Sequence, residues 1–202
     1  MEMNDFFDFC SKLVLSKIMV CPTGLKKDKN GISGNRNLIK GNYEGIDFPV
    51  VFKQEKESGK RFSDLLDTGH SNLYLISDRM KTVLEENNLT GWQTYPIKLY
   101  DKKGNEIFGY HGFSVVGHCG PKRYEKSKII EKQFIPKGPV VKYYKGVFFD
   151  DWDGSDFFTP EESFMIFITK KSADVLKKNK ITNFWLENLA DYETDVTNVK
   201  KS

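Results

Sequence analysis

Two stretches of the chain, LYLISDRMKTVLEENNLTGWQTYPI (residues 73–97) and MIFITKKSADVLKKNKITNFWLENL (residues 165–189), decide how it is expected to fold. They align without a gap at a constant offset of 92 residues, and five of the 25 positions are identical. The identical pairs are Ile76/Ile168, Val83/Val175, Leu84/Leu176, Asn87/Asn179 and Thr90/Thr182. We therefore predict an internal duplication of a β-α-β element. The alternative is that any two strand–helix–strand units resemble each other to this degree.

The first stretch has clear signals for each of its elements. NLYLIS (residues 72–77) is a short apolar run of the kind found in buried strands. Ser77 or Asp78 can cap a following helix, because a short side-chain oxygen accepts a hydrogen bond from an otherwise unpaired N–H. WQTYPIKLY (residues 92–100) then alternates as a half-buried strand does.

The sequence outside these stretches is mostly of strand type. FPVVFK (residues 48–53) and IFGYHGFSVVG (residues 107–117) predict strands, and DKKGNE (residues 101–106) predicts a hairpin turn with Gly104 at positive φ. Nearer the N-terminus we expect a helix around Asp5–Val20.

These elements together predict the fold class α+β, with a mixed, largely antiparallel sheet and two internally related β-α-β units. We expect residues 1–47 to be a poorly defined N-terminal segment and residues 48–202 to form one α+β domain.

Composition limits the function classes. The chain of 202 residues is 39% hydrophobic and 29% charged, with a formal net charge of +3, which is too small to indicate nucleic-acid binding by itself. Its longest early apolar run, LVLSKIMV, is short and interrupted by Lys17, so we expect neither a signal peptide nor a membrane span and place the protein in the cytoplasm. Three cysteines without CxxC spacing do not indicate a disulfide framework.

Charge is unevenly distributed in the second half of the chain. From Lys122 to Lys145 there are eight basic and two acidic residues, whereas Asp150–Glu162, DDWDGSDFFTPEE, holds six acidic residues and no basic one. Either the two segments form oppositely charged patches on the surface, or they neutralise each other within the fold.

The acidic stretch has some features of a metal or catalytic site. With Asp151 as position 1 of a twelve-residue calcium loop, Asp153, Ser155, Phe157 and Glu162 fall on ligand positions, but position 6 lacks the glycine that its sharp turn requires. Its carboxylates could also serve as a general acid and base. Asp-Gly and Ser-Asp are good turn formers, so a simple turn is the plainer interpretation.

Other chemistry has weaker support. His70, His111, His118 and Cys119 lack the spacing of a zinc site, and the sequence has no nucleophile or phosphate-loop motif. Aromatic residues among the lysines of 122–145 offer stacking for single-stranded nucleic acid, an alternative that no recognition motif supports.

Four segments resemble an immunity-protein family of bacterial polymorphic toxin systems, the eleventh such family, formerly a domain of unknown function. They are NLYLISDRMKTVLEENNLTGWQTYPIKLYDKKGNEI, GYHGFSVVGHCGP, WDGSDFFTPE and FITKKSADVLKKNKITN. The likeness spans roughly Phe48 to Leu189, in order. It implies a non-enzymatic protein that binds and neutralises a cognate toxin domain, and it supplies no catalytic residues.

The prediction is therefore an immunity protein that acts by direct protein–protein contact, without cofactor or metal and without nucleic acid or membrane as a partner. An aromatic anchor with a charged rim suits such a contact. The predicted partner-binding residues are Asp151, Trp152, Asp153, Asp156, Phe157 and Phe158. The alternative is a metal-dependent enzyme or metal-binding protein that uses the same turn.

Overall fold

The computed structural model describes residues 3–12, 14–25 and 34–199, and most of their regular structure is strand. Within these residues the strands form four sheets, accompanied by three α-helices. Most neighbouring strands are antiparallel. The predicted mixed class is confirmed: helices and strands are combined, and the sheets are antiparallel or mixed.

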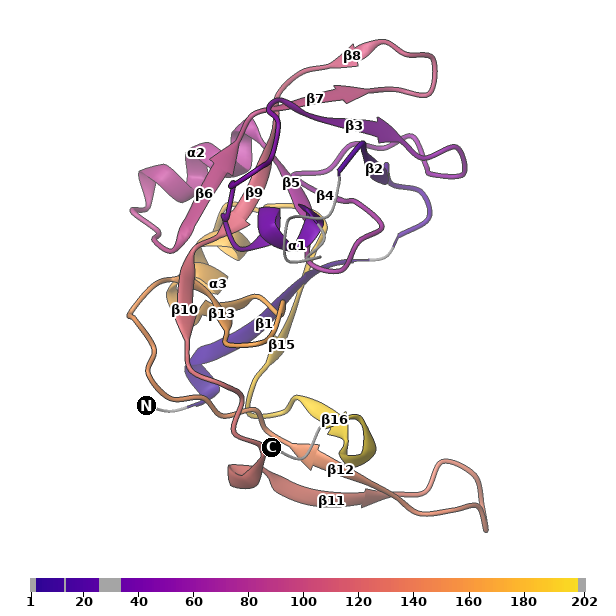
Figure 1. Ribbon diagram of the computed structural model, residues 1–202. Coiled ribbons are helices and arrows are strands. Elements are labelled where there is room, and N and C mark those ends of the chain that lie inside the picture. Colours follow the sequence, from indigo (N-terminus) through magenta and orange to yellow (C-terminus); the bar gives the residue numbers. More distant parts are fainter. Residues whose placement is uncertain (1–2, 13, 26–33, 200–202) are drawn as a thin grey trace.

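The largest sheet has five strands and crosses the middle of the molecule (Figure 1). In spatial order they are β10 (Gly117–Cys119), β13 (Phe157–Pro160), β14 (Phe167–Thr169), β1 (Phe6–Ser11) and β15 (Phe184–Asn188). β10 and β13 are parallel, and the other neighbours are antiparallel.

The helix expected around Asp5–Val20 is wrong, because Phe6–Ser11 forms β1 in the interior of this sheet. Both faces of β1 are covered: Phe9 and Phe6 are buried in two different apolar clusters. A strand buried on both faces carries apolar residues without strict alternation, which sequence periodicity does not separate from a helix.

A second sheet, of four antiparallel strands, adjoins the first. It consists, in spatial order, of β4 (Leu65–Asp67), β5 (Tyr74–Ser77), β9 (Tyr110–Val115) and β6 (Trp92–Tyr95).

Two smaller sheets lie at opposite ends of the molecule (Figure 1). One contains β2 (Val20–Thr23), β3 (Val50–Gln54), β7 (Ile97–Tyr100) and β8 (Glu106–Ile107), and α1 (Gly34–Ile39) shares its apolar cluster. The other contains β11 (Lys128–Lys132), β12 (Val141–Lys145) and β16 (Glu193–Asp195). Short 3-10 helices occur at Met3–Asp5, Tyr124–Lys126 and Val196–Asn198.

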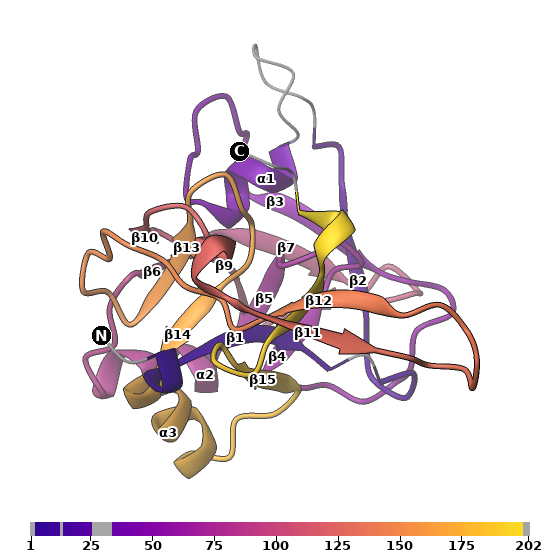
Figure 2. The same ribbon diagram turned by 90° about the horizontal axis from the view of Figure 1, so that it is seen from below.

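The helices α2 (Asp78–Glu86) and α3 (Lys170–Lys178) lie on the same side of the molecule (Figure 2). The predicted cap at Ser77 is confirmed: its Oγ accepts from the Met80 N–H at 3.1 Å. Thr169, 92 residues later, caps α3 in the same way. At the other end, the side-chain amides of Asn87 and Asn179 donate to the carbonyl four residues earlier in each helix.

One apolar cluster joins α2, α3 and the two larger sheets. Phe113 of β9 and Phe9 of β1 occupy comparable places, each in a strand flanked by the strand before and the strand after a helix. Phe113 stacks on Trp92, and Phe9 stacks on Phe184. Both also contact the edge of the Phe157 ring, so this core fixes the two strand–helix–strand units against each other.

Candidate functional site

The acidic turn Asp150–Glu162 covers the outer edge of β10. The Asp153 N–H donates to the His118 carbonyl at 3.2 Å, and the Asp153 carboxylate accepts from the His118 N–H at 2.9 Å. The Asp150 carbonyl accepts from the Gly120 N–H at 2.8 Å. An uncovered edge would leave these backbone groups open to pairing with another chain. The first half of the turn therefore completes the large sheet.

Asp156 ties the second half of the turn to both helical units. Its carboxylate accepts hydrogen bonds from the Thr90 N–H at 3.0 Å, from the Thr169 hydroxyl at 3.0 Å and from the Lys171 ammonium at 3.0 Å. The residue is 7% exposed. A buried carboxylate needs such donors to offset its lost hydration, and these donors come from two different segments. Asp156 is thus an internal connection between the units.

A second buried aspartate makes the reciprocal connection. Asp64, 92 residues before Asp156, accepts from the Ser77 hydroxyl at 2.9 Å, the Thr182 N–H at 2.9 Å and the Arg79 guanidinium at 2.7 Å. Each aspartate therefore bonds the cap residue of its own unit and the threonine that precedes the last strand of the other. Sequence reasoning missed Asp64, although SDLL (residues 63–66) and SDFF (residues 155–158) stand at the same offset.

The aromatic residues of the turn belong to the core. Phe157 and Phe158 are both 0% exposed, and they face two different apolar clusters on opposite sides of β13. Trp152 is partly buried against Phe6 and Phe158, and its indole N–H donates to the Ser155 carbonyl at 3.0 Å. Of the six predicted contact residues, these three aromatics and Asp156 are held mainly by internal contacts.

Two carboxylates of the turn, those of Asp150 and Asp153, have a lowered pKa. The Lys126 ammonium and the Arg123 guanidinium hold the pKa of Asp150 below its ordinary value. Burial raises the pKa of Asp153, but hydrogen bonds from Ser155 and His118 outweigh it and leave that pKa lowered. Asp151 is exposed, with a backbone φ of 51°. A general acid–base pair needs two pKa values pushed apart, and the two shifted carboxylates of the turn both move downward.

An open cavity of about 510 Å³ lies beside the turn. Its polar lining includes Lys40, His118, Asp151 and Glu161. The calcium-loop arrangement does not fit here, since Phe157, its seventh position, begins β13 and is buried. Within the described part of the chain, no three His, Cys, Asp or Glu side chains are grouped to hold a metal ion.

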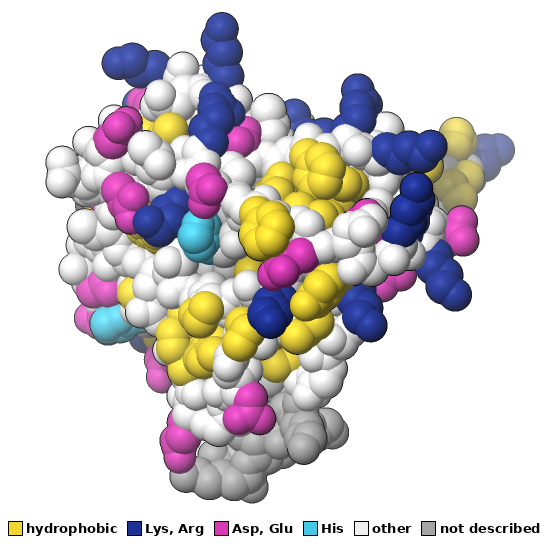
Figure 3. Space-filling model, turned by 90° about the horizontal axis from the view of Figure 1, so that it is seen from above, with side chains coloured by type: hydrophobic (Ala, Val, Ile, Leu, Met, Phe, Trp, Pro, Cys, Tyr) yellow, Lys and Arg dark blue, Asp and Glu magenta, His cyan; other side chains and the backbone are white. Residues whose placement is uncertain are grey.

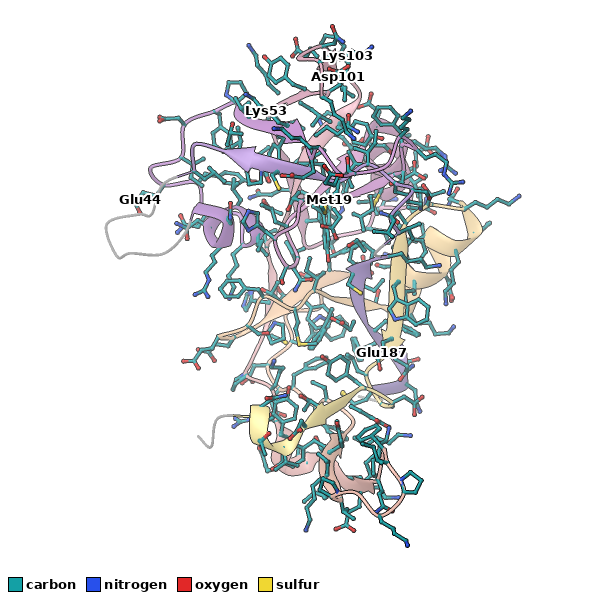
Figure 4. The ribbon with its side chains drawn as sticks, turned by 90° about the vertical axis from the view of Figure 1, so that its right-hand side faces the viewer. Met19, Glu44, Lys53, Asp101, Lys103 and Glu187 are labelled. Atoms are coloured by element: carbon teal, nitrogen blue, oxygen red, sulfur yellow. The ribbon has the colours of Figure 1, made fainter. Side chains whose placement is uncertain are left out.

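One half-buried carboxylate outside the turn has an unusual ionisation. Asp8 lies opposite Glu187 across β1 and β15, at the junction between the five-stranded and three-stranded sheets (Figure 4 labels Glu187). Burial and, to a smaller extent, the Glu187 carboxylate raise the pKa of Asp8 to about 7, and the Lys122 ammonium partly opposes them.

We expect Asp8→Asn to stabilise the protein at neutral pH. Because the folded-state pKa lies above the unfolded value, the contribution of Asp8 to stability is present below about pH 4 and is lost as pH rises through about 7. The substitution should therefore raise the free energy of unfolding at pH 7.5 by roughly 1–2 kcal/mol and change it little at pH 4. Urea unfolding at both pH values measures this, and an equal effect at the two values would contradict it.

Within the described residues, no helix has the length and apolar character needed to cross a membrane.

Comparison with protein families identifies the family of this chain. A search of curated proteins found no similar sequence. The family profile described as Immunity protein family (Imm11) matches residues 15–191, which is most of the chain and includes the acidic turn, both helical units and the β11–β12 hairpin. Immunity proteins of polymorphic toxin systems protect against a cognate toxin and are typically not enzymes. The chain belongs to the Imm11 immunity protein family.

Proposed function

We propose that the chain neutralises its cognate toxin domain by direct, non-covalent contact. The observation that carries this proposal is the family match over residues 15–191. Family membership implies a toxin partner, and direct contact is the mechanism that we add. The acidic turn does not favour the alternative of a metal or catalytic site, because the carboxylates of Asp150, Asp153 and Asp156 are occupied by internal hydrogen bonds and ion pairs.

A stable scaffold favours such contact, because a surface that is already formed loses little conformational freedom on binding.

We propose that the two strand–helix–strand units are copies of one ancestral element. The matched helix caps and the reciprocal bonds of Asp64 and Asp156 support this origin. The hydrogen bonds of Asp64 and Asp156 hold the two units together, whichever surface of the chain meets the toxin domain.

The turn contributes to the contact through its outward-facing part. Asp151 is exposed, and the His118 side chain is 72% exposed, whereas the Asp153 side chain that pairs with it is 23% exposed. Charges at the rim of an interface act mainly on the association rate. Asp151→Lys should therefore slow association with the toxin domain several-fold and leave the dissociation rate nearly unchanged, as surface plasmon resonance measures.

We place this activity in the cytoplasm. Cys10, Cys21 and Cys119 are all free thiols, as is usual in a reducing compartment.

Co-expression tests the proposed function. The toxin domain encoded by the gene adjacent to this one is expressed from an inducible promoter, with or without the wild-type chain. We expect the chain to restore growth and to co-purify with the toxin domain in one complex. Continued toxicity in the presence of folded, abundant chain would contradict the proposal.

A further inference from the structure

The hairpin Lys128–Lys145, formed by β11, β12 and their connection, extends away from the body of the molecule (Figures 1 and 2). Four of the eleven large hydrophobic side chains that are exposed among the described residues lie on it. They are Ile129 (56%), Phe134 (66%), Ile135 (67%) and Val140 (55%).

Few side chains of the hairpin pack against the body of the molecule. None of its residues belongs to any of the three apolar clusters of the described chain. Phe134 contacts Tyr143 within the hairpin, and Tyr144 contacts Tyr124, which links the base of the hairpin to the third of these clusters. A small sheet without a core on either face is only marginally stable, so the hairpin gains stability when another surface covers it.

β11 is also an open edge. The order of its sheet is β11-β12-β16, and no strand among the described residues pairs with the outer side of β11. Its outward N–H and C=O groups are therefore available to an added strand, in the mode by which extended segments join exposed sheet edges. Elsewhere the molecule covers such an edge, as the acidic turn covers β10.

Charge selects the kind of strand that fits. Lys128 and Lys137 form no ion pair with any described residue, and residues 122–145 carry eight basic and two acidic side chains. In an antiparallel pairing of two copies of β11, Lys128 of one would approach Lys132 of the other. Like charges placed opposite each other destabilise a strand pair. The edge thus disfavours a second copy and favours an acidic segment.

We propose that the β11 edge accepts an extended, acidic strand of the toxin domain, with the exposed apolar side chains of the hairpin packing beside it. This inference rests on the proposed function and adds where and how the partner binds.

A second apolar area lies at the opposite end of the molecule, where hydrophobic side chains gather in the middle of the surface with Lys and Arg around them (Figure 3). Phe108, which follows β8 there, is 78% exposed. This area is the less favoured site. Its β8 edge has only two residues, whereas β11 offers five.

Matched charge reversals test the inference. The hairpin variant is Lys128→Glu/Lys137→Glu, and the control is Lys98→Glu/Lys103→Glu, which makes the same charge change at the far end of the molecule, where Figure 4 labels Lys103. All four lysines are exposed. Binding is measured by calorimetry with the toxin domain from the adjacent gene, inactivated by substitution. We expect the hairpin variant to weaken binding at least tenfold and the control to stay within about twofold of wild type.

Amide hydrogen exchange provides the second readout. In the complex, the amides of residues 128–132 should exchange at least tenfold more slowly than in the free chain. Binding of wild type with neither an effect of the hairpin variant nor protection of β11 would overturn this inference and leave the proposed function standing. Protection of β11 in the free chain together with a dimer by light scattering would overturn it in favour of a second copy. Failure of wild type to bind at all would contradict the proposed function itself.

Discussion

Asp156→Ala should lower the free energy of unfolding by about 3 kcal/mol, since it removes a buried, charged acceptor on which several donors converge. The Thr90 N–H, the Thr169 hydroxyl and the Lys171 ammonium would all lose their partner. Lys171 is 55% exposed and can turn to water, so the loss comes mainly from the other two groups. Urea unfolding followed by circular dichroism measures the change.

Two further variants control this measurement. Asp64→Ala should cost a similar amount, because Asp64 makes the reciprocal bonds to Ser77 and Thr182. Asp151→Ala removes an exposed carboxylate five residues away and should change stability by less than about 0.5 kcal/mol. If Asp156→Ala lowers the free energy of unfolding by less than about 1 kcal/mol, the hydrogen bonds of Asp156 contribute little to stability.

Phe157→Ala should be the most destabilising single change in the acidic turn, at about 4 kcal/mol. The ring is fully buried and contacts Phe9 and Phe113, which belong to different sheets. Its removal leaves a cavity where the two units meet. The variant is therefore expected to unfold at a markedly lower temperature in a calorimetric scan.

Phe134→Ala is the matched control for this truncation. Phe134 is 66% exposed on the hairpin, so the same substitution should cost less than about 1 kcal/mol. If binding is lost in Phe134→Ala while stability is kept, the exposed ring acts at the interface. Equal stability losses in the two variants would contradict the assignment of Phe157 to the core and Phe134 to the surface.

Local signals in the sequence predicted individual elements well. The helix from Asp78 to Glu86 begins at the expected cap, and the DKKGNE turn has Gly104 at a φ of 88°. FPVVFK supplies β3. These features depend on hydrogen bonds or backbone conformations within a few residues, so a short window of sequence contains their cause.

Long-range features were harder to predict. WQTYPIKLY was expected to be one strand but forms β6 and β7, which belong to different sheets on either side of Pro96. Proline lacks the N–H that a continuous ladder requires. The central place of Phe6–Ser11 depends on partners more than 150 residues away, β14 and β15, which no local pattern reveals.

The acidic turn shows why composition alone did not separate its exposed residues from its internal ones. The same carboxylates suit an exposed acidic rim or an internal network, and the choice depends on donors from distant segments. For Asp156 these donors are Thr90, 66 residues away, and Lys171. The exposure of the hairpin was not predicted, because Ile129 and Phe134 lie in segments of strand type, where such residues are usually buried, and only the structure shows them exposed.

The most direct test of the central claim is the stoichiometry of neutralisation. The activity of a fixed amount of the toxin domain is measured while the wild-type chain is added. A binding protein that acts by direct contact should reduce activity in proportion to its concentration and abolish it at one chain per toxin domain. The toxin should recover its activity when the complex is dissociated. Complete inactivation at a small fraction of one equivalent, without recovery after the chain is removed, would show that the chain modifies its target enzymatically and would contradict this account.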